Sequence, residues 1–214
     1  MATGHGNNPG ERQRYYSCLL YTSGATIFGC GDARRPGSLY WTKGNNPDSN
    51  PENNRLDICS ASETLQNGCL WNGTPFVFSN LRLFQIYPDL VNSGNFLAQE
   101  IPNGKGLFAR WAITSGPAGI FFLSEDGIYV TQGGPPVSIT DAKLRPLFSS
   151  QGGNGETVNG IPAPDMTQEQ SLRLTIVDSI LYFDYIGIDG TPHTLLYDMV
   201  ANFWLCLLYT SRCV

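Results

Sequence analysis

The chain has 214 residues and a mass of 23.4 kDa, with a net charge of −5 at pH 7 and a pI near 4.9. Only 14% of its residues are charged, against roughly a quarter in an average globular protein, while 24 residues are Gly and 14 are Pro. This composition excludes a disordered acidic tail and a coiled coil. The acidic balance argues against nucleic-acid binding, which needs a basic face, and the apolar runs are too short for a membrane span.

The hexapeptide CLLYTS occurs twice, at Cys18–Ser23 and at residues 206–211, with no similarity around either copy. It is either a coincidental Leu- and Tyr-rich strand or a repeat that belongs to the DNA. The codons TGT CTC TTA TAC ACA TCT encode it and resemble a transposon-end adapter used to prepare sequencing libraries. A second adapter in the opposite orientation then encodes Arg212, Cys213, Val214 and a stop codon, which favours the adapter interpretation.

The adapter interpretation divides the chain into three parts. We expect residues 1–23 to be a doubtful leader with an adapter-like scar, residues 24–205 to be the folded body, and residues 206–214 to be an adapter-like tail. The first copy of the hexapeptide is then expected to interrupt the first sheet rather than complete it. The apolar residues of the tail can extend a strand begun at Asn202. Truncation to residues 24–205 is expected to change the stability by less than about 1 kcal/mol.

Within the body, short apolar runs alternate with turn residues, and aromatic and β-branched residues dominate the runs, as in strands. Asn72-Gly73, Asp126-Gly127 and Asp189-Gly190 are dipeptides that tolerate the positive φ angles of tight hairpin turns. Helix is expected only as single turns, within residues 141–148 and 166–172. The predicted strands are residues 25–29, 38–42, 55–58, 75–79, 82–87, 107–114, 119–124, 127–131, 171–177, 180–186, 194–198 and 202–205.

Three segments of the body share one form, in which an apolar strand, a tight turn and a second strand follow one another. They contain FVFS from Phe76, FFLS from Phe121 and YFDY from Tyr182, spaced by 45 and then 61 residues. A period of about 40–50 residues with four short strands per unit is typical of propeller blades. The sequence therefore predicts an all-β chain that forms part of a β-propeller, with three to four blade-like antiparallel sheets.

One segment, GDARRPGSLYW from Gly31 to Trp41, resembles a turn and strand of β-propeller proteins from phage virions and phage-like metagenomic DNA. FVFSNLRLFQI after the Asn72-Gly73 hairpin and FFLSEDGIYVTQGG from Phe121 are similar to the same group. Within phage, the chain resembles tail accessory and packaged-DNA stabilisation proteins that plug or extend the portal. The resemblance covers most of residues 24–204. It implies a location in the virion, other virion proteins as partners and a truncated ring, and it brings no catalytic residue.

Residues for nucleophilic catalysis or metal binding are few. The two His residues are His5, in the doubtful leader, and His193, beside a predicted turn. A single His in the body leaves no Ser-His-Asp or Cys-His set and too few ligands for a metal. Cys30, Cys59 and Cys69 form an odd set without a CxxC pair, so they are predicted to be small buried apolar residues. No metal or cofactor site is predicted.

Carboxylates near hairpins leave one enzymatic alternative open. Glu125, Asp126, Asp184 and Asp189 all lie at or near predicted turns. Glu125 and Asp126 belong to a segment similar to the Asp-box turn of sialidase propellers, but that box needs one residue between its Asp and Gly and a Trp that is absent here. We therefore expect a non-enzymatic structural protein with no catalytic residue. The alternatives are a glycan-hydrolysing propeller with two acids about 5–10 Å apart and a glycan-binding module with an exposed aromatic patch.

Overall fold

The computed structural model describes residues 18–23, 26–44, 46, 53–60, 62–140, 144–149 and 154–207. In these ranges the chain is all-β, with four antiparallel sheets of four strands each. Strands within a sheet follow chain order, so each sheet is a meander of hairpins. Helix is limited to two 3₁₀ turns, Arg145–Leu147 and Glu169–Ser171, both inside the segments predicted for single turns.

Sheets I and II come from the first half of the chain. Sheet I contains β1 (Cys18–Ser23), β2 (Thr26–Cys30), β3 (Ser38–Trp41) and β4 (Arg55–Asp57). Sheet II contains β5 (Leu65–Trp71), β6 (Thr74–Ser79), β7 (Leu83–Pro88) and β8 (Phe96–Glu100).

Sheets III and IV follow in the second half. Sheet III contains β9 (Ile113–Gly116), β10 (Gly119–Ser124), β11 (Gly127–Thr131) and β12 (Val137–Ser138). Sheet IV contains β13 (Arg173–Val177), β14 (Ile180–Ile186), β15 (Pro192–Asp198) and β16 (Phe203–Leu207).

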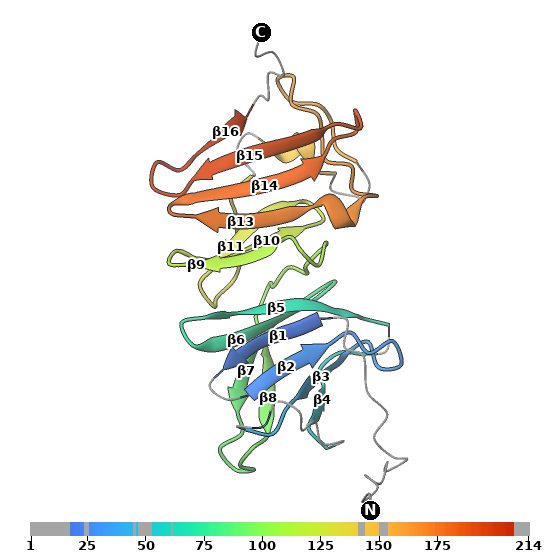
Figure 1. Cartoon of the computed structure of the whole chain (residues 1–214), viewed down its shortest axis with the longest axis vertical. Coiled ribbons are helices and arrows are strands. Elements are labelled where there is room, and N and C mark those ends of the chain that lie inside the picture. Colours follow the sequence, from blue (N-terminus) through green and yellow to red (C-terminus); the bar gives the residue numbers. More distant parts are fainter. Residues whose placement is uncertain are drawn as a thin grey trace, which may run out of the picture.

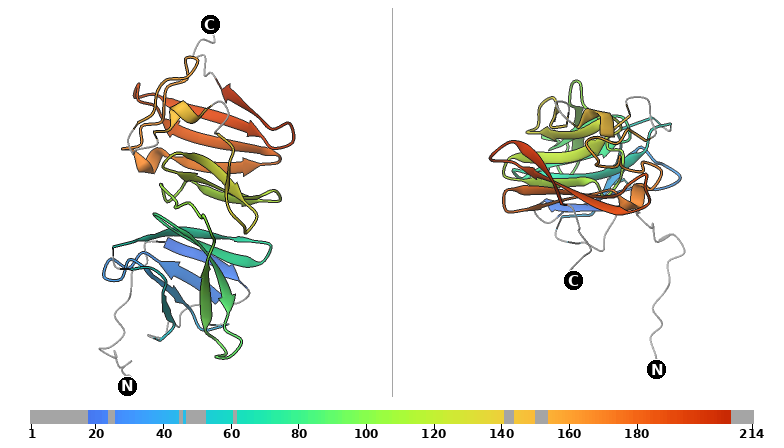
Figure 2. Two further views of the ribbon diagram at one scale, coloured as in Figure 1. Left: turned by 180° about the vertical axis from the view of Figure 1, so that it is seen from behind. Right: turned by 90° about the horizontal axis from the view of Figure 1, so that it is seen from above.

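The four sheets have a propeller-like arrangement. The first strand of each sheet contacts the first strand of the next, so β1, β5, β9 and β13 form the inner row (Figure 1). Sheets I and IV lie at opposite ends of this arc. In Figure 1, sheet I is at the bottom and sheet IV is at the top. Figure 2 shows the same succession from behind, with the segment between sheets III and IV crossing one face of sheet IV.

Apolar side chains fill the space between successive sheets. One cluster joins sheets I and II and contains Phe28 and Val77; a second joins sheets II and III and contains Phe78 and Phe122. The third and largest joins sheets III and IV and includes Phe183. Aromatic residues bury large apolar areas, which makes these interfaces the main source of stability. The arc is therefore held together by sheet-on-sheet packing.

Three Trp residues add a polar link at the same interfaces. Each indole N–H donates a hydrogen bond to a backbone carbonyl of the neighbouring sheet or of a connection beside it, which satisfies the indole while its ring packs between the sheets. The pairs are Trp41 to Gly94 at 3.0 Å, Trp71 to Gly116 at 3.1 Å, and Trp204 to Ile139 at 2.9 Å.

Most predicted strands are confirmed within one or two residues, but the prediction for residues 107–114 is wrong over its first six residues. The chain there turns between sheets II and III, and β9 begins only at Ile113. Leu107, Ala109 and Ala112 are fully buried in this turn. A short apolar run looks the same whether it is a strand or a buried connection. Besides β1, three strands were not predicted, namely β5, β8 and β12. β8 is a largely exposed edge strand and β12 is short.

The expectation that Cys18–Ser23 interrupts the first sheet is also wrong. This segment is β1, and it pairs antiparallel with β2 from Cys18↔Cys30 to Ser23↔Thr26, with one irregularity between Leu20 and Thr22. Leu, Tyr and Thr suit a strand, and the edge of β2 offers backbone groups that need partners. Strand pairing therefore follows from the hexapeptide's chemistry, whatever its origin. At the other end, the second copy does extend a strand, because β16 continues through Leu207.

Candidate functional site

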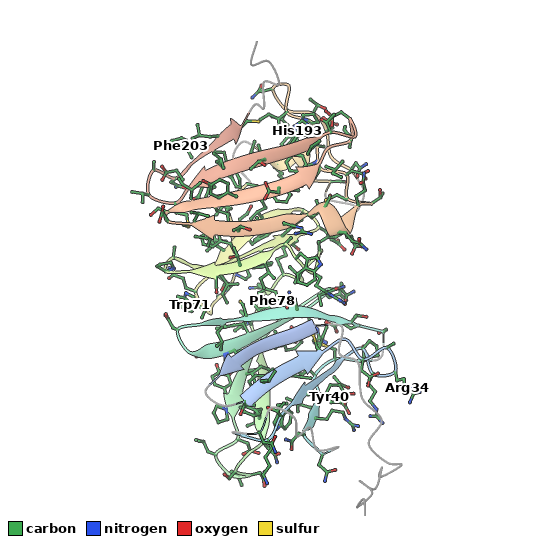
Figure 3. The ribbon with its side chains drawn as sticks, viewed as in Figure 1. Arg34, Tyr40, Trp71, Phe78, His193 and Phe203 are labelled. Carbon is green, nitrogen blue, oxygen red and sulfur yellow. The ribbon has the colours of Figure 1, made fainter. Side chains whose placement is uncertain are left out.

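The segment that resembles phage propeller proteins forms the connection from β2 to β3. Asp32 Oδ1 accepts a hydrogen bond from the Arg34 N–H, and its Oδ2 accepts one from the Tyr40 hydroxyl, both at 2.9 Å. A Cβ on Gly37 would lie 2.6 Å from the carbonyl oxygen of Cys59, so the backbones approach too closely for a side chain. Figure 3 shows Arg34 at the outer end of this turn. These residues shape the turn and bring no reactive group together.

A buried carboxylate that the sequence analysis missed lies between sheets I and II. Glu63, whose side chain is only 5% exposed, accepts hydrogen bonds from Arg82 Nε at 3.0 Å and from an Arg82 terminal nitrogen at 2.6 Å. The Ser79 hydroxyl also donates to Glu63. The other terminal nitrogen of Arg82 binds Glu100 at 2.7 Å. Only Ser79 and Arg82 are close in sequence, in the turn after β6. Glu63 comes from the loop before β5 and Glu100 from the end of β8.

The Arg82 cluster (Glu63, Ser79, Arg82 and Glu100) favours the charged form of Glu63. Hydrogen bonding from Arg82 lowers the pKa of Glu63, although burial acts in the opposite direction. Burial, followed by the charge of Glu63, raises the pKa of the nearby Cys59 thiol to about 12. A general acid needs a raised carboxyl pKa and a nucleophilic cysteine needs a lowered thiol pKa. The cluster therefore has the properties of a structural clamp.

Of the carboxylates predicted near hairpins, Asp126 forms an ion pair with Lys105 at 2.9 Å. Burial is the largest single influence and would raise the pKa of Asp126, but the hydrogen bonds from Lys105 and Tyr129 and the charge of Lys105 together lower that pKa. The ammonium of Lys105 also lies 5.4 Å from the centre of the Tyr129 ring. The turn differs by one residue from the prediction: Ser124 pairs with Gly127, so Glu125 and Asp126 are its central residues.

Asp189 and His193 meet at the turn between β14 and β15. The His193 Nε2 atom lies 2.9 Å from the Thr191 hydroxyl and 3.1 Å from both Asp189 carboxylate oxygens. In a Ser-His-Asp relay, the hydroxyl and the carboxylate contact opposite ring nitrogens. Here the hydroxyl and the carboxylate both contact Nε2 of His193. The Thr191 hydroxyl donates a hydrogen bond to Asp189 at 2.7 Å. Hydrogen bonds from Thr191 lower the pKa of Asp189 to about 2, so the trio stabilises a turn.

The predicted carboxylates thus belong to separate local clusters. Asp126 lies at the β10–β11 turn of sheet III, whereas Asp189 lies at a turn of sheet IV. Asp184 lies within β14 and accepts a hydrogen bond from the Thr194 hydroxyl at 2.6 Å. Across the described part of the chain, no group of three or more His, Cys, Asp or Glu side chains is placed to hold a metal ion.

An exposed apolar surface lies on sheet IV. One face of this sheet packs against sheet III and the segment before β13 through side chains such as Leu181, Phe183 and Tyr185. Because strand residues alternate between faces, their neighbours point to the other side. Phe203 in Figure 3 marks β16 at the edge of the sheet. The apolar residues of this other side, here called the open face, are Val177, Ile180, Tyr182, Leu196, Phe203 and Leu205.

Burial patterns show that, within the described part of the chain, no layer covers the open face. Every residue of β10 in sheet III is buried, since sheets cover it on both sides. Along β14, buried and half-buried residues alternate strictly. On the open face Val177 is 52% exposed, Phe203 41% and Leu205 48%. None of the residues of the open face belongs to the three apolar clusters. Contiguous exposed apolar surface of this kind marks interaction sites.

A polar hollow borders the same sheet. It has a volume of about 580 Å³ and is lined by Thr167, Gln168, Glu169, Gln170, Ser171 and Ile186. It is wide open to solvent at the 3₁₀ turn that precedes β13. Part of its polar wall is already used internally, because the Gln168 side-chain amide donates to Asp165 at 2.7 Å.

Comparison with known proteins does not assign the chain. No protein-family model matches it, and no curated protein matches it significantly. Among the residues with described positions, no helix is long and apolar enough to cross a membrane.

Proposed function

We propose that this chain is a non-enzymatic structural or assembly protein of a phage-type particle, a tail- or portal-associated propeller that works through contacts with other virion proteins. The observation that carries the proposal is the open face of sheet IV, an exposed apolar surface on a four-stranded sheet. Propeller architecture alone fixes no function. We propose a phage-type particle because the motifs from Gly31 to Trp41 and in the later hairpins resemble virion propellers.

The carboxylates that are paired with cations support a structural role. Glu63 and Asp126 are each held by a cation, and their pKa values are lowered. A glycosidase of the two-carboxylate type needs one acid with a raised pKa opposite a second free carboxylate. The network around Arg82 instead cross-links the loop before β5, the β6–β7 turn and the end of β8.

The genes that flank the coding sequence on its source DNA test this proposal directly. Portal, terminase or tail genes beside it are the expected result. A neighbourhood of carbohydrate-utilisation genes would contradict the virion role and favour a glycan-directed protein.

The alternative of a glycan-binding propeller has one supporting observation, the polar hollow beside β14. Amide, hydroxyl and carboxylate groups of residues 167–171 line it, and such groups suit sugar hydroxyls. Titration calorimetry of the full chain with glycans tests this alternative. Binding that is lost in Gln170→Ala and kept in the control Gln132→Ala, which alters an exposed glutamine on sheet III, would favour it over the assembly role.

A further inference from the structure

The negative charge of the chain is concentrated on the segment that carries sheet IV. Residues 154–207 contain seven acidic residues and one basic residue, so this segment has a net charge of −6. The rest of the chain, with 11 of the 18 acidic residues and 12 of the 13 basic residues, is close to neutral. The open face therefore lies on the acidic part of the molecule. The seven acidic residues are Glu156, Asp165, Glu169, Asp178, Asp184, Asp189 and Asp198.

Three of these carboxylates lie on or beside the open face. Phe183 and Tyr197 pack into the apolar cluster between sheets III and IV. Asp184 and Asp198 directly follow them on the same strands, so they lie on the opposite side of the sheet, which is the side of the open face. Asp178 is exposed in the turn that joins β13 to β14.

The carboxylates flank a row of side chains that crosses all four strands. Asp198 and Asp184 lie two residues along the strands from this row, on opposite sides and each about 6.6 Å away. On one side Arg173 is the cross-strand neighbour of Asp184 and offsets its charge, whereas the side of Asp178 and Asp198 stays negative. The row, here called the central row, consists of Thr175, Tyr182, Leu196 and Leu205.

We propose that the open face of sheet IV binds a cationic amphipathic helix of another protein. The inference rests on the proposed assembly role and names the chemistry of one partner. The apolar stripe of such a helix covers the central row, and Lys or Arg side chains on its flanks extend their charges to the carboxylates beside the row. At 1.5 Å per residue, a helix of about 13 residues covers the roughly 19 Å of four strands.

Charge separates this partner from other occupants of the same face. A second copy of the chain would bring two acidic faces together, and juxtaposed like charges disfavour binding. A cationic partner is attracted by the whole acidic segment, which speeds its association at low salt. One short helix buries less than the roughly 1,200–2,000 Å² of a standard interface, so we expect reversible binding with a dissociation constant of about 10–100 µM.

Fluorescence anisotropy of labelled peptides mixed with the full chain tests the proposal. The probe is a designed helix of about 14 residues with Leu along one face and Lys elsewhere. One matched peptide carries Glu in place of Lys, and another has the Leu and Lys residues in an order that forms no apolar stripe. At about 50 mM salt the Lys probe should bind at least about ten-fold more tightly than either matched peptide, and about 300 mM salt should weaken it several-fold.

The apolar part of the contact is tested by Leu205→Ser. This change removes a side chain that is 48% exposed in the central row, and it should raise the dissociation constant of the Lys probe about ten-fold. Leu90→Ser is the matched control, because Leu90 is 96% exposed between β7 and β8 of sheet II. It should bind the probe like the parent chain.

The electrostatic part is tested by Asp198→Asn. The Asp198 carboxylate accepts hydrogen bonds from two backbone N–H groups of the turn after β15, and an amide oxygen can accept the same bonds. The matched control is Asp89→Asn, since Asp89 accepts two backbone N–H groups in the same way after β7. Asp198→Asn should raise the dissociation constant about two- to three-fold at low salt and have little effect at high salt, whereas Asp89→Asn should have no effect at either.

Near-ultraviolet circular dichroism checks the fold of each variant, and Asp198→Asn with the Glu peptide keeps the test valid if Leu205→Ser fails to fold. A parent chain that does not bind the Lys probe, equal binding of either matched peptide, or folded open-face variants that bind like the parent would each overturn the proposal. Sedimentation of the parent as a dimer that Leu205→Ser abolishes would assign the face to a second copy and also overturn it. Gene neighbours of the phage type together with absent peptide binding would remove this inference alone and leave the proposed function in place.

Discussion

Replacing Arg82 by Met gives a direct test of the buried carboxylate between sheets I and II. The substitution keeps most of the side-chain volume and removes the cation that binds Glu63 and Glu100. Glu63 is then left as a buried anion with the Ser79 hydroxyl and the Cys59 thiol as side-chain donors. The matched control is Arg55→Met, which removes an ion pair with Asp57 at 3.2 Å between side chains that are 28% and 54% exposed.

The expected loss follows from burial. Removing one partner of a fully buried ion pair costs about 3–5 kcal/mol. Because Arg82 is 36% exposed, solvent screens part of this effect, and we expect a loss of about 2 kcal/mol in the free energy of unfolding. In a chain of this size that corresponds to about 4–8 °C in melting temperature. Arg55→Met should cost no more than about 0.5 kcal/mol.

The pH dependence separates a lost ion pair from lost packing. Arg82 lowers the pKa of Glu63 in the folded chain, so the pair stabilises the fold fully above the unfolded-state pKa of about 4.3. This contribution disappears as the pH falls through the lowered value. Urea unfolding at pH 7 and in steps below pH 4 should therefore show the gap between parent and Arg82→Met narrowing. Equal losses in both Arg variants at pH 7, or a gap that is independent of pH, would refute the reasoning.

Three further predictions concern the fold. Phe122→Ala should cost about 3–5 kcal/mol in urea unfolding, because Phe122 is fully buried between sheets II and III; the exposed control Val137→Ala should cost almost nothing. Gly73→Ala should cost about 1 kcal/mol, because Gly73 has φ +76°, whereas Gly134→Ala has open space and should be close to neutral. Deleting residues 1–23 should lower the free energy of unfolding by clearly more than about 1 kcal/mol, since it removes β1 from sheet I; an unchanged melting curve would show that β1 adds no stability.

The all-β class, the succession of similar sheets and several turns follow from local sequence. Asn72 and Gly73 have φ angles of 48° and 76°, which is the conformation that this dipeptide predicts. Apolar runs such as that from Gly119 to Ser124 are strands because aromatic and branched residues fit a pleated, buried surface. Backbone sterics act over a few residues, so these turns and strands can be predicted without knowledge of the segments that pack against them.

Other elements depend on distant partners. β8 is a largely exposed edge strand with polar residues, and it is defined by its pairing with β7. The clamp of Glu63 by Arg82 joins residues 19 positions apart through the packing of sheets I and II. The hexapeptide of β1 pairs with β2 although its codon pattern suggested an unrelated origin.

Tyr182 shows the same division within a single residue. Its aromatic character and its place in the hairpin are visible in the sequence, and they match Phe76 and Phe121. Whether such a side chain is buried depends on the presence of the next sheet, which local sequence does not encode. Sheets II and III each have a following sheet and bury their aromatic residue there. Because no described sheet follows sheet IV, only the tertiary structure turns the same pattern into an open surface.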